Sequence, residues 1–393
     1  MIFSCLGLGR FALGMLLPAM GVSLSLDYAE MGFISTGNFI GYFLAVLFCA
    51  PIARKIGARA TIALSLFLVG ASMILVSRAE GFIAVLLLYI LTGMGSGGAN
   101  VPMMGLISHW FSRKARGKSA GFIVIGSGFA IVFSGAFVPA INQAFGVEGW
   151  RISWMTLGAI SLAVAATAAL LLRNKPDEFG LRAVGAEAID ANAPAKLAIP
   201  FDPQAHRRIL AHLGGIYFFF GYTYVIYATF IVTTLVKERG FPEATAGQFW
   251  SWVGLLSLFS GPVFGMISDK LGRKTGLISV FILHGASYLL VALPLPTPFL
   301  YLSIGLFGFA AWSIPGIMAA AVGDYMGPER AVSGFGAITL FFGAGQIVGP
   351  ALAGMLAETQ GSFASSYMMA AVMAALAIVL TAFLPKPSGA EHH

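Results

Sequence analysis

The chain alternates long apolar runs with short polar loops over nearly its whole length. Twelve runs contain about 18 or more largely apolar residues, which is long enough for a helix to cross a bilayer. They cover roughly residues 1 to 24, 31 to 53, 60 to 77, 81 to 108, 117 to 142, 152 to 173, 209 to 236, 244 to 268, 275 to 294, 297 to 323, 331 to 357 and 363 to 384. Strand-type alternation is absent from these runs. The pattern predicts an all-α membrane protein with twelve transmembrane helices.

Two loops of similar sequence lie 215 residues apart. Residues 50 to 59 read A-P-I-A-R-K-I-G-A-R, and residues 265 to 274 read G-M-I-S-D-K-L-G-R-K. Four glycine pairs have the same spacing: Gly32 with Gly247, Gly57 with Gly272, Gly121 with Gly336, and Gly128 with Gly343. This repeat indicates two copies of one six-helix unit, as in many transporters.

The repeat and a polar stretch rich in Ala and Pro predict the domain boundaries. We expect an N-terminal six-helix bundle at 1–181, a cytoplasmic linker at 182–205, a C-terminal six-helix bundle at 206–386, and a tail with a tag remnant at 387–393. The chain begins inside its first apolar run without a polar leader, which suggests a trimmed start. That run has no cleavage site, so we expect it to be retained as a helix.

Composition and charge agree with a membrane protein. Hydrophobic residues make up 58% of the chain and charged residues 10%. Both termini are predicted to be cytoplasmic, because Lys and Arg residues then concentrate in the cytoplasmic loops. The opposite loops hold only Arg78, Arg151, Lys237 and Arg239. The net charge of +7 thus reflects topology, and no nucleic-acid partner is expected.

The loop G-M-I-S-D-K-L-G-R-K resembles the signature that transporters of the major facilitator superfamily carry after their second and eighth helices. Other segments look like a bacterial branch of YbfB-type carriers, and one loop also resembles monocarboxylate and oxalate/formate carriers. Those segments are Gly7 to Met20, His109 to Gly121, Gly149 to Arg151 and Gly221 to Phe230. The resemblance implies the major facilitator fold, two pseudo-symmetric six-helix bundles, in a bacterial cytoplasmic (inner) membrane.

The resemblance also implies a conformational latch at the two loops. Asp269 would lie at the cytoplasmic end of the eighth helix, against the N-terminus of the eleventh, where the helix dipole favours a carboxylate. Arg273 and Lys274 would hold neighbouring helix ends. The remaining latch residues are Arg54, Gly57, Gly265 and Gly272.

The first loop departs from the family pattern, because Arg54 replaces the acid and Ala50 replaces the first glycine. We therefore expect Arg54 to pair across the bundles with Asp324 or Glu329. The alternative is that Arg54 is a plain surface residue.

Arg10 is the strongest candidate for substrate binding. All sixteen Asp and Glu residues fall in predicted loops or helix ends, so Arg10 is the only charged side chain near mid-membrane depth. A guanidinium stays protonated, and its burial in a membrane costs at least about 2.5 kcal/mol without compensation. Since an Arg matches a carboxylate with two parallel hydrogen bonds, the compensating anion is predicted to be the substrate. The alternative is that Arg10 reaches the cytoplasmic surface or bonds carbonyls near Pro18.

Further candidates are polar or aromatic residues within the predicted helices. Tyr217, Phe220, Tyr224 and Tyr227 recur at spacings of three and four on the seventh helix, and packing is the alternative role for such a stripe. The 215-residue offset places Arg10 opposite Val225, beside Tyr224. His284 is expected to be a packing histidine whose nitrogens have partners. The complete substrate-binding set is predicted to be Arg10, Asn38, Tyr42, Asn100, Ser127, Tyr217, Tyr224, Tyr227, Trp252, Trp312 and Gln346.

These features predict a secondary transporter that moves a small organic anion, a carboxylate in the first instance, by alternating access. Symport with protons, transport of the protonated substrate, anion exchange and uncoupled flux all remain open. No ATP-binding loop, catalytic set, cofactor or metal site is predicted, and the protein is expected to be a monomer in the lipid bilayer. The alternatives are an exporter of drugs or lipophilic compounds and a non-transporting sensor on the same fold.

Overall fold

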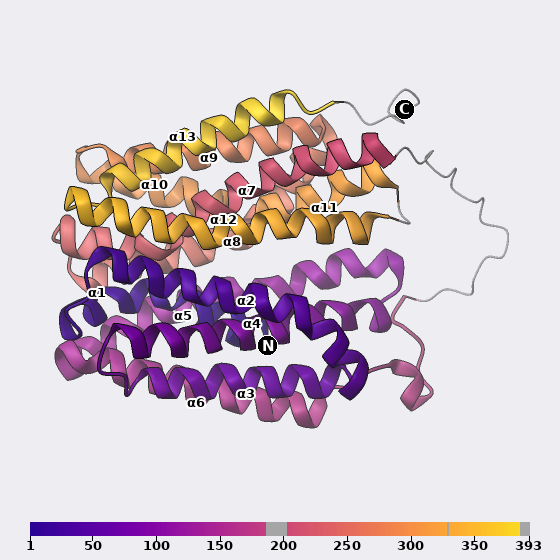
Figure 1. Ribbon diagram of the computed structural model, residues 1–393, viewed down its shortest axis with the longest axis horizontal. Coiled ribbons are helices and arrows are strands. Elements are labelled where there is room, and N and C mark those ends of the chain that lie inside the picture. Colours follow the sequence, from indigo (N-terminus) through magenta and orange to yellow (C-terminus); the bar gives the residue numbers. More distant parts are fainter. Residues whose placement is uncertain (186–202, 328–329, 386–393) are drawn as a thin grey trace. The chain divides into compact units, whose positions relative to one another are not determined.

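The computed structural model describes residues 1–185, 203–327 and 330–385, which form an all-helical membrane protein (Figure 1). Eleven helical segments in these ranges are long and apolar enough to span a membrane. One of them, Gly121–Leu171, has 51 residues and would be about 76 Å long if straight. It contains two helices separated by a turn at Gly146–Glu148, so it crosses twice. The predicted twelve-helix major facilitator fold is confirmed.

The first six crossings are formed by elements from η1 to α6. Their bounds are η1 (Phe3–Phe11), α1 (Leu13–Ser23), α2 (Tyr28–Ile56), α3 (Ala58–Val76), α4 (Phe82–Trp110), α5 (Arg113–Phe145), η2 (Gly146–Glu148) and α6 (Gly149–Leu171). A short 3₁₀ turn, η3 (Pro176–Phe179), follows.

The last six crossings are formed by elements from α7 to α13. Their bounds are α7 (Pro203–Thr233), η4 (Thr234–Glu238), α8 (Glu243–Leu271), α9 (Arg273–Ala292), α10 (Thr297–Ala310), α11 (Ser313–Met326), α12 (Ala331–Gln360) and α13 (Ala364–Ala382).

Local sequence explains where several helices begin and end. Before α2, the Asp27 side chain accepts a hydrogen bond from the Glu30 N–H, and the Glu30 carboxylate accepts one from the Asp27 N–H. This reciprocal cap satisfies two backbone donors that a helix start leaves free. Gly57 separates α2 from α3, and Gly272 separates α8 from α9. Both have positive φ, which glycine adopts without a steric penalty.

The first and tenth crossings, which carry candidate residues, are irregular. The first one starts as a π-helix, η1, in which the Ala12 N–H bonds the Gly7 carbonyl five residues back at 3.2 Å. The tenth is broken between α10 and α11, and Trp312 lies at the break. The Trp312 N–H donates to Ser260 Oγ at 3.2 Å, and Ser313 Oγ donates to the Ser260 carbonyl at 3.0 Å. The Ser260 side chain of α8 therefore supplies the Trp312 N–H with the acceptor that a continuous helix would provide.

The chain divides into two compact units. The first consists of Met1–Ala193 with Ile231–Gly254, and the second of Pro194–Phe230 with Leu255–His393. Residues 231–254, which the sequence prediction assigns to the C-terminal bundle, thus pack with the first unit. There α5 and α8 touch through backbone, since a Cβ at Gly247 would collide with the Gly135 carbonyl. The predicted bundle boundaries stay a prediction.

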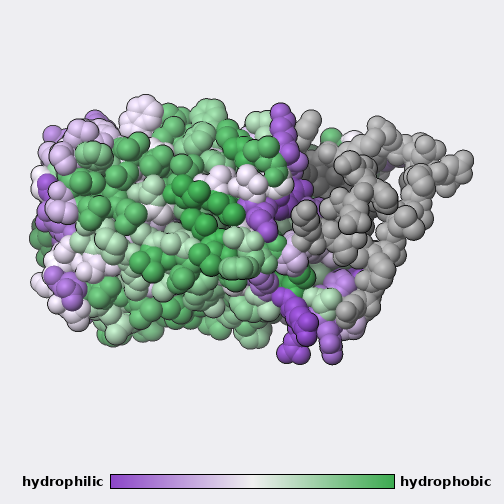
Figure 2. All heavy atoms as spheres, turned by 90° about the horizontal axis from the view of Figure 1, so that it is seen from above, coloured by the Kyte–Doolittle hydropathy of each residue, from purple (hydrophilic) through white to green (hydrophobic). Residues whose placement is uncertain are grey.

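The outer helix surfaces are apolar. Phe67, Phe122, Val332 and Val372 are each more than half exposed, and Figure 2 shows apolar residues over the middle of the visible face with polar residues toward its ends. Exposed apolar side chains of this kind are suited to contact lipid.

Candidate binding site

Arg10 lies in a polar cluster inside the first unit. Its side chain belongs to η1 and is only 9% exposed. Arg10 Nε donates to Asn38 Oδ1 at 3.4 Å. The guanidinium carbon lies over the Phe39 ring at 4.6 Å and the Tyr42 ring at 4.4 Å from each centroid. Aromatic faces attract a cation within about 6 Å, so α2 holds the guanidinium with an amide and two rings.

The positive charge of Arg10 has no carboxylate partner among the residues that the structure describes. Ion pairs in that part of the chain include Arg151 with Glu148, and Arg273 with Asp269 and Asp324. Within the same residues, Arg10 Nη2 is buried and makes no hydrogen bond. A buried donor without a partner costs about 1–3 kcal/mol, and more when it is charged. The side chains of α2 therefore hold the guanidinium in place, and its Nη2 can still donate a hydrogen bond to a ligand.

Asn38 and Tyr89 fix the orientation of this cluster. Asn38 Nδ2 donates to the Gly9 carbonyl at 3.3 Å and to the Tyr89 carbonyl at 3.4 Å. The Tyr89 hydroxyl donates to the Arg10 carbonyl at 3.1 Å. With its amide nitrogen used in this way, Asn38 presents its oxygen to Arg10. Sequence reasoning missed Tyr89, since one tyrosine in an apolar run gives no signal of a partner.

Tyr42 and Asn100 extend the cluster from α2 to α4. Asn100 Nδ2 donates to the Tyr42 hydroxyl at 2.8 Å, while Asn100 Oδ1 is buried and has no partner in the described part of the chain. Both residues keep part of their surface exposed. The predicted candidate Ser127 uses its hydroxyl differently, since Ser127 Oγ donates to the Val124 carbonyl of its own helix at 2.8 Å.

The predicted candidates of the second unit form an aromatic stack. Tyr217 lies on Phe342 at a centroid distance of 4.4 Å, and Tyr224 lies on Phe220 at 4.9 Å. Trp312 meets Tyr224 edge-on at 5.7 Å. The Gln346 amide donates to the Tyr224 hydroxyl. The structure thus brings Tyr217, Tyr224, Trp312 and Gln346 into one connected group.

The two remaining aromatic candidates are Tyr227 and Trp252. The Tyr227 ring stacks on Phe307 at 4.0 Å and also meets Tyr288 and Tyr367, and its hydroxyl bonds Ser303 Oγ at 2.9 Å. Its contacts are thus with α9, α10 and α13. Trp252, on α8, has 53% of its surface exposed. A binding role for either residue stays a prediction.

His284 corrects one expectation. It is fully buried on α9 and packs against Phe307, Phe220 and Tyr288 at centroid distances of 5.3, 5.9 and 5.8 Å. The prediction of a packing residue agrees with this environment. The expectation that its nitrogens have partners is wrong, because neither Nδ1 nor Nε2 makes a hydrogen bond to any described residue.

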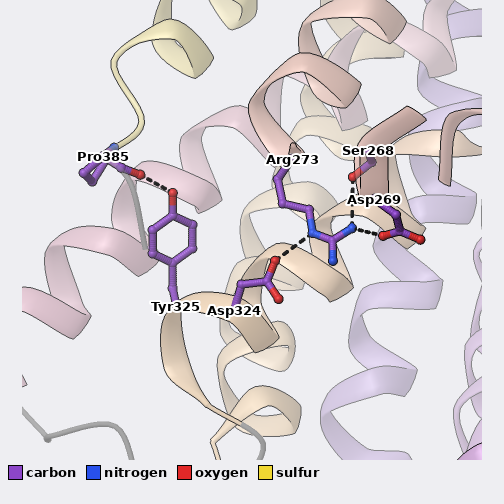
Figure 3. Close-up of polar contacts among 6 residues, drawn as sticks. All are labelled: Ser268, Asp269, Arg273, Asp324, Tyr325 and Pro385. Carbon is purple, nitrogen blue, oxygen red and sulfur yellow. Dashed lines mark hydrogen bonds and ion pairs between the residues drawn. The ribbon is translucent and has the colours of Figure 1, made fainter. Parts of the chain in front are cut away.

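Around the second predicted latch loop, Arg273 joins three helices (Figure 3). Its guanidinium donates to Asp269 and to Ser268 Oγ at the end of α8, and to Asp324 Oδ2 at 2.7 Å at the end of α11. Tyr325, next to Asp324, donates to the Pro385 carbonyl. Asp269 is thus bonded to Arg273.

The two loops also contain equivalent basic residues, because Lys274 follows Arg59 by 215 positions. Arg59 Nε donates to the Ala169 carbonyl at 2.8 Å, near the end of α6. Lys274 Nζ donates to the Ala382 carbonyl at 2.8 Å, at the end of α13. Each cation therefore satisfies a carbonyl that the helix end leaves free.

Arg54 is exposed near the end of α2. Asp324 is bonded to Arg273, and Glu329 lies outside the described residues. Pairing of Arg54 with either acid stays a prediction, as does the latch function of Gly57, Gly265, Asp269, Gly272, Arg273 and Lys274.

A family model described as "Uncharacterised MFS-type transporter YbfB" matches residues 2–382. The chain belongs to this family. The resemblance stated from its sequence motifs is thereby confirmed, and the chain is a multi-pass transporter of the major facilitator superfamily.

Several characterised members of the superfamily are similar to this YbfB-type transporter. A hexuronate transporter of Bacillus subtilis is 25% identical, over 98% of this chain and 93% of its own length. Human monocarboxylate transporter 2 is 23% identical, over 87% of this chain and 74% of its own length. A quinolone resistance transporter of Acinetobacter baumannii is 23% identical, over 95% of this chain and 88% of its own length.

Solved structures agree on the fold. The crystal structure of a bacterial homologue of the human lysosomal transporter Spinster, in an inward-facing and occupied conformation, superimposes with a TM-score of 0.75. The alignment covers 98% of this chain and 94% of that one, at 15% sequence identity.

Proposed function

We propose that this YbfB-type transporter is a secondary carrier that moves a small organic anion, a carboxylate in the first instance, across the bacterial inner membrane by alternating access. Both termini lie in the cytoplasm in this proposal, because that orientation places most Lys and Arg residues inside. Relatives named for hexuronate and monocarboxylates support an acidic substrate.

One observation carries the proposal. Arg10 is buried, without a carboxylate partner among the described residues, and it keeps an unused donor at Nη2. An arginine buried for structural reasons alone would be expected to have all its donors satisfied. A carboxylate supplies both the opposite charge and the missing acceptors. The rings of Phe39 and Tyr42 hold the guanidinium without neutralising it, so its charge is retained for the ligand.

The cluster also bears on energy coupling. Arg10, Asn38, Tyr42, Asn100 and Tyr89 include no carboxylate or imidazole that could accept a proton near neutral pH. Proton symport through this cluster would therefore have to move the proton on the substrate itself. Anion exchange and uncoupled flux need no titratable group, and flux measured at different pH gradients separates the three.

The binding test is a thermal-shift screen of purified protein against monocarboxylates, dicarboxylates, neutral sugars and cationic dyes. Stabilisation should follow mass action and be confined to the anions. Arg10→Gln should weaken anion binding at least tenfold, since charge-assisted hydrogen bonds contribute about 1.5–3 kcal/mol. Arg78→Gln removes an exposed arginine outside the cluster and is the matched control. Equal anion binding by Arg10→Gln and the parent would refute the proposal.

Export of a lipophilic drug is the second candidate, favoured by the quinolone resistance relative and by the aromatic stack around Tyr224. In that case, quinolones or dyes would stabilise the protein, and Tyr224→Ala would abolish the effect while Arg10→Gln would not. A sensor on the same fold would bind ligand without flux in proteoliposomes.

A further inference from the structure

Two hydrogen-bonding atoms that have no partner among the described residues belong to side chains that contact Tyr42. One is Arg10 Nη2, a charged donor, whose guanidinium carbon is 4.4 Å from the centre of the Tyr42 ring. The other is Asn100 Oδ1, a neutral acceptor, whose amide is tied to the Tyr42 hydroxyl at 2.8 Å. Buried polar atoms in proteins are nearly always hydrogen-bonded, so two exceptions at residues that contact the same side chain point to a ligand that can bond both.

These two atoms require different chemistry from the ligand. Arg10 has only donors to offer and needs an anionic oxygen. Asn100 Oδ1 is an acceptor and needs an O–H or N–H. A carboxylate satisfies the first atom but not the second, because an ionised carboxylate has no hydrogen to donate. A simple fatty acid or a fully ionised dicarboxylate would therefore leave the amide oxygen unpaired.

The hydrogen bond of Asn100 fixes which of its atoms is available. Nδ2 is engaged by the Tyr42 hydroxyl, which leaves the oxygen for the ligand. The Tyr42 hydroxyl accepts that bond and retains its own proton, so it can donate to a further ligand oxygen. Tyr42 and Asn100 are only partly buried, so a small ligand can approach the cluster from their exposed side.

We propose that the Arg10 cluster recognises a hydroxycarboxylate, with the carboxylate on Arg10 and a hydroxyl donating to Asn100 Oδ1. This inference rests on the proposed anion transport and narrows its substrate class. A neutral hydrogen bond contributes about 0.5–1.5 kcal/mol, which corresponds to roughly a three- to tenfold preference for the hydroxylated member of a matched pair.

The test uses butyrate and its 2-, 3- and 4-hydroxy derivatives, whose Kd values are measured on the purified full-length protein. The three isomers place the hydroxyl at increasing distance from the carboxylate along the carbon chain. We expect at least one of them to bind three- to tenfold more tightly than butyrate. Equal affinity for all four would overturn the hydroxycarboxylate assignment while leaving anion binding intact. Absence of binding by all four and by other anions would instead refute the proposed function.

Two variants locate the preference. Asn100→Leu removes the acceptor at similar volume, and we expect the Kd values of the hydroxybutyrates to become equal to that of butyrate in this variant, whatever happens to butyrate affinity itself. Arg10→Gln should weaken all four ligands together. A hydroxyl preference that survives in Asn100→Leu would overturn the assignment. The affinities of the four ligands for the unmodified protein require no substitution. They therefore test the hydroxycarboxylate assignment even if a variant fails to fold.

Discussion

Gly57 and Gly272, which are 215 residues apart, have the same backbone conformation. Their φ and ψ values are 86° and 154° for Gly57, and 92° and 153° for Gly272. Each residue ends one long helix and begins the next. The sequence repeat is therefore also a repeat of backbone geometry, and the two loops turn their helices in the same way.

This conformation is essentially restricted to glycine and costs other residues of order 1–3 kcal/mol. We expect Gly57→Ala and Gly272→Ala each to lower stability by about that amount, measured as the loss in unfolding free energy in detergent. Gly57→Ala should cost more, because its Cβ would lie 3.2 Å from the Asn174 amide, whereas the Gly272 Cβ meets no atom of the described residues within 4 Å.

Gly265→Ala is the control for these substitutions. Gly265 lies within α8, and a Cβ there has nothing within 4 Å. Alanine is favoured over glycine in a helix by about 0.5–1 kcal/mol, so stability should stay equal or rise. Destabilisation by Gly265→Ala as large as by Gly272→Ala would argue against a backbone cause.

The bond between Arg273 and Asp324 should contribute a small, salt-sensitive coupling. The Arg273 side chain is 23% exposed and that of Asp324 is 41% exposed, and ion pairs open to solvent typically contribute up to about 1 kcal/mol. A double-mutant cycle with Arg273→Gln and Asp324→Asn should show that coupling and its decrease at high salt. Additive effects would show that the pair contributes nothing to stability.

Replacement of His284 by Phe should leave stability unchanged or raise it. Burial of two ring nitrogens without hydrogen bonds costs free energy that an apolar ring avoids, and the surrounding rings of Phe220, Phe307 and Tyr288 can pack on another ring. The midpoint of thermal unfolding tests this directly. A clear loss of stability in His284→Phe would show that the imidazole has a polar partner in the membrane, and a loss of flux at full stability would assign it a role in transport.

The α5–α8 contact should tolerate no side chain at Gly247. A Cβ there would overlap the Gly135 carbonyl, and overpacking of this kind costs about 1–3 kcal/mol or more. Gly247→Ala should therefore lower the unfolding midpoint. Gly261→Ala, on the same helix with nothing within 4 Å of its Cβ, should not. Equal behaviour of the two variants would contradict the backbone contact.

The fold could be predicted because its determinants are local or periodic. Runs of apolar residues identify the crossings, since a bilayer imposes their length, and the spacing of the two loops reveals the duplication. The irregular segments could not be predicted in this way. The π-helix of residues 3–11 and the break at Trp312 depend on hydrogen bonds to distant residues such as Ser260, which composition does not record.

The candidate site was predictable in part for the same reason. Arg10, Asn38, Tyr42 and Asn100 were identified because polar residues are rare at such positions, and they lie together in the structure. The contribution of Tyr89 could not be predicted, because its hydroxyl bonds a backbone carbonyl. Pairing of Arg54 with Asp324 or Glu329 stays a prediction, whereas the bond of Asp324 to Arg273, which lies on a neighbouring helix, was not foreseen.

The π-helical start of the first crossing affects how Arg10 tolerates changes in chain length. Each turn of a π-helix holds more residues than an α-helical turn, so η1 contains surplus chain. Deletion of a single residue such as Leu6 would let this segment approach ordinary α-helical winding, because it removes a residue that the wider turn accommodates. The segment that carries Arg10 can therefore absorb a loss of one residue that a regular α-helix would convert into a rotation of about 100°.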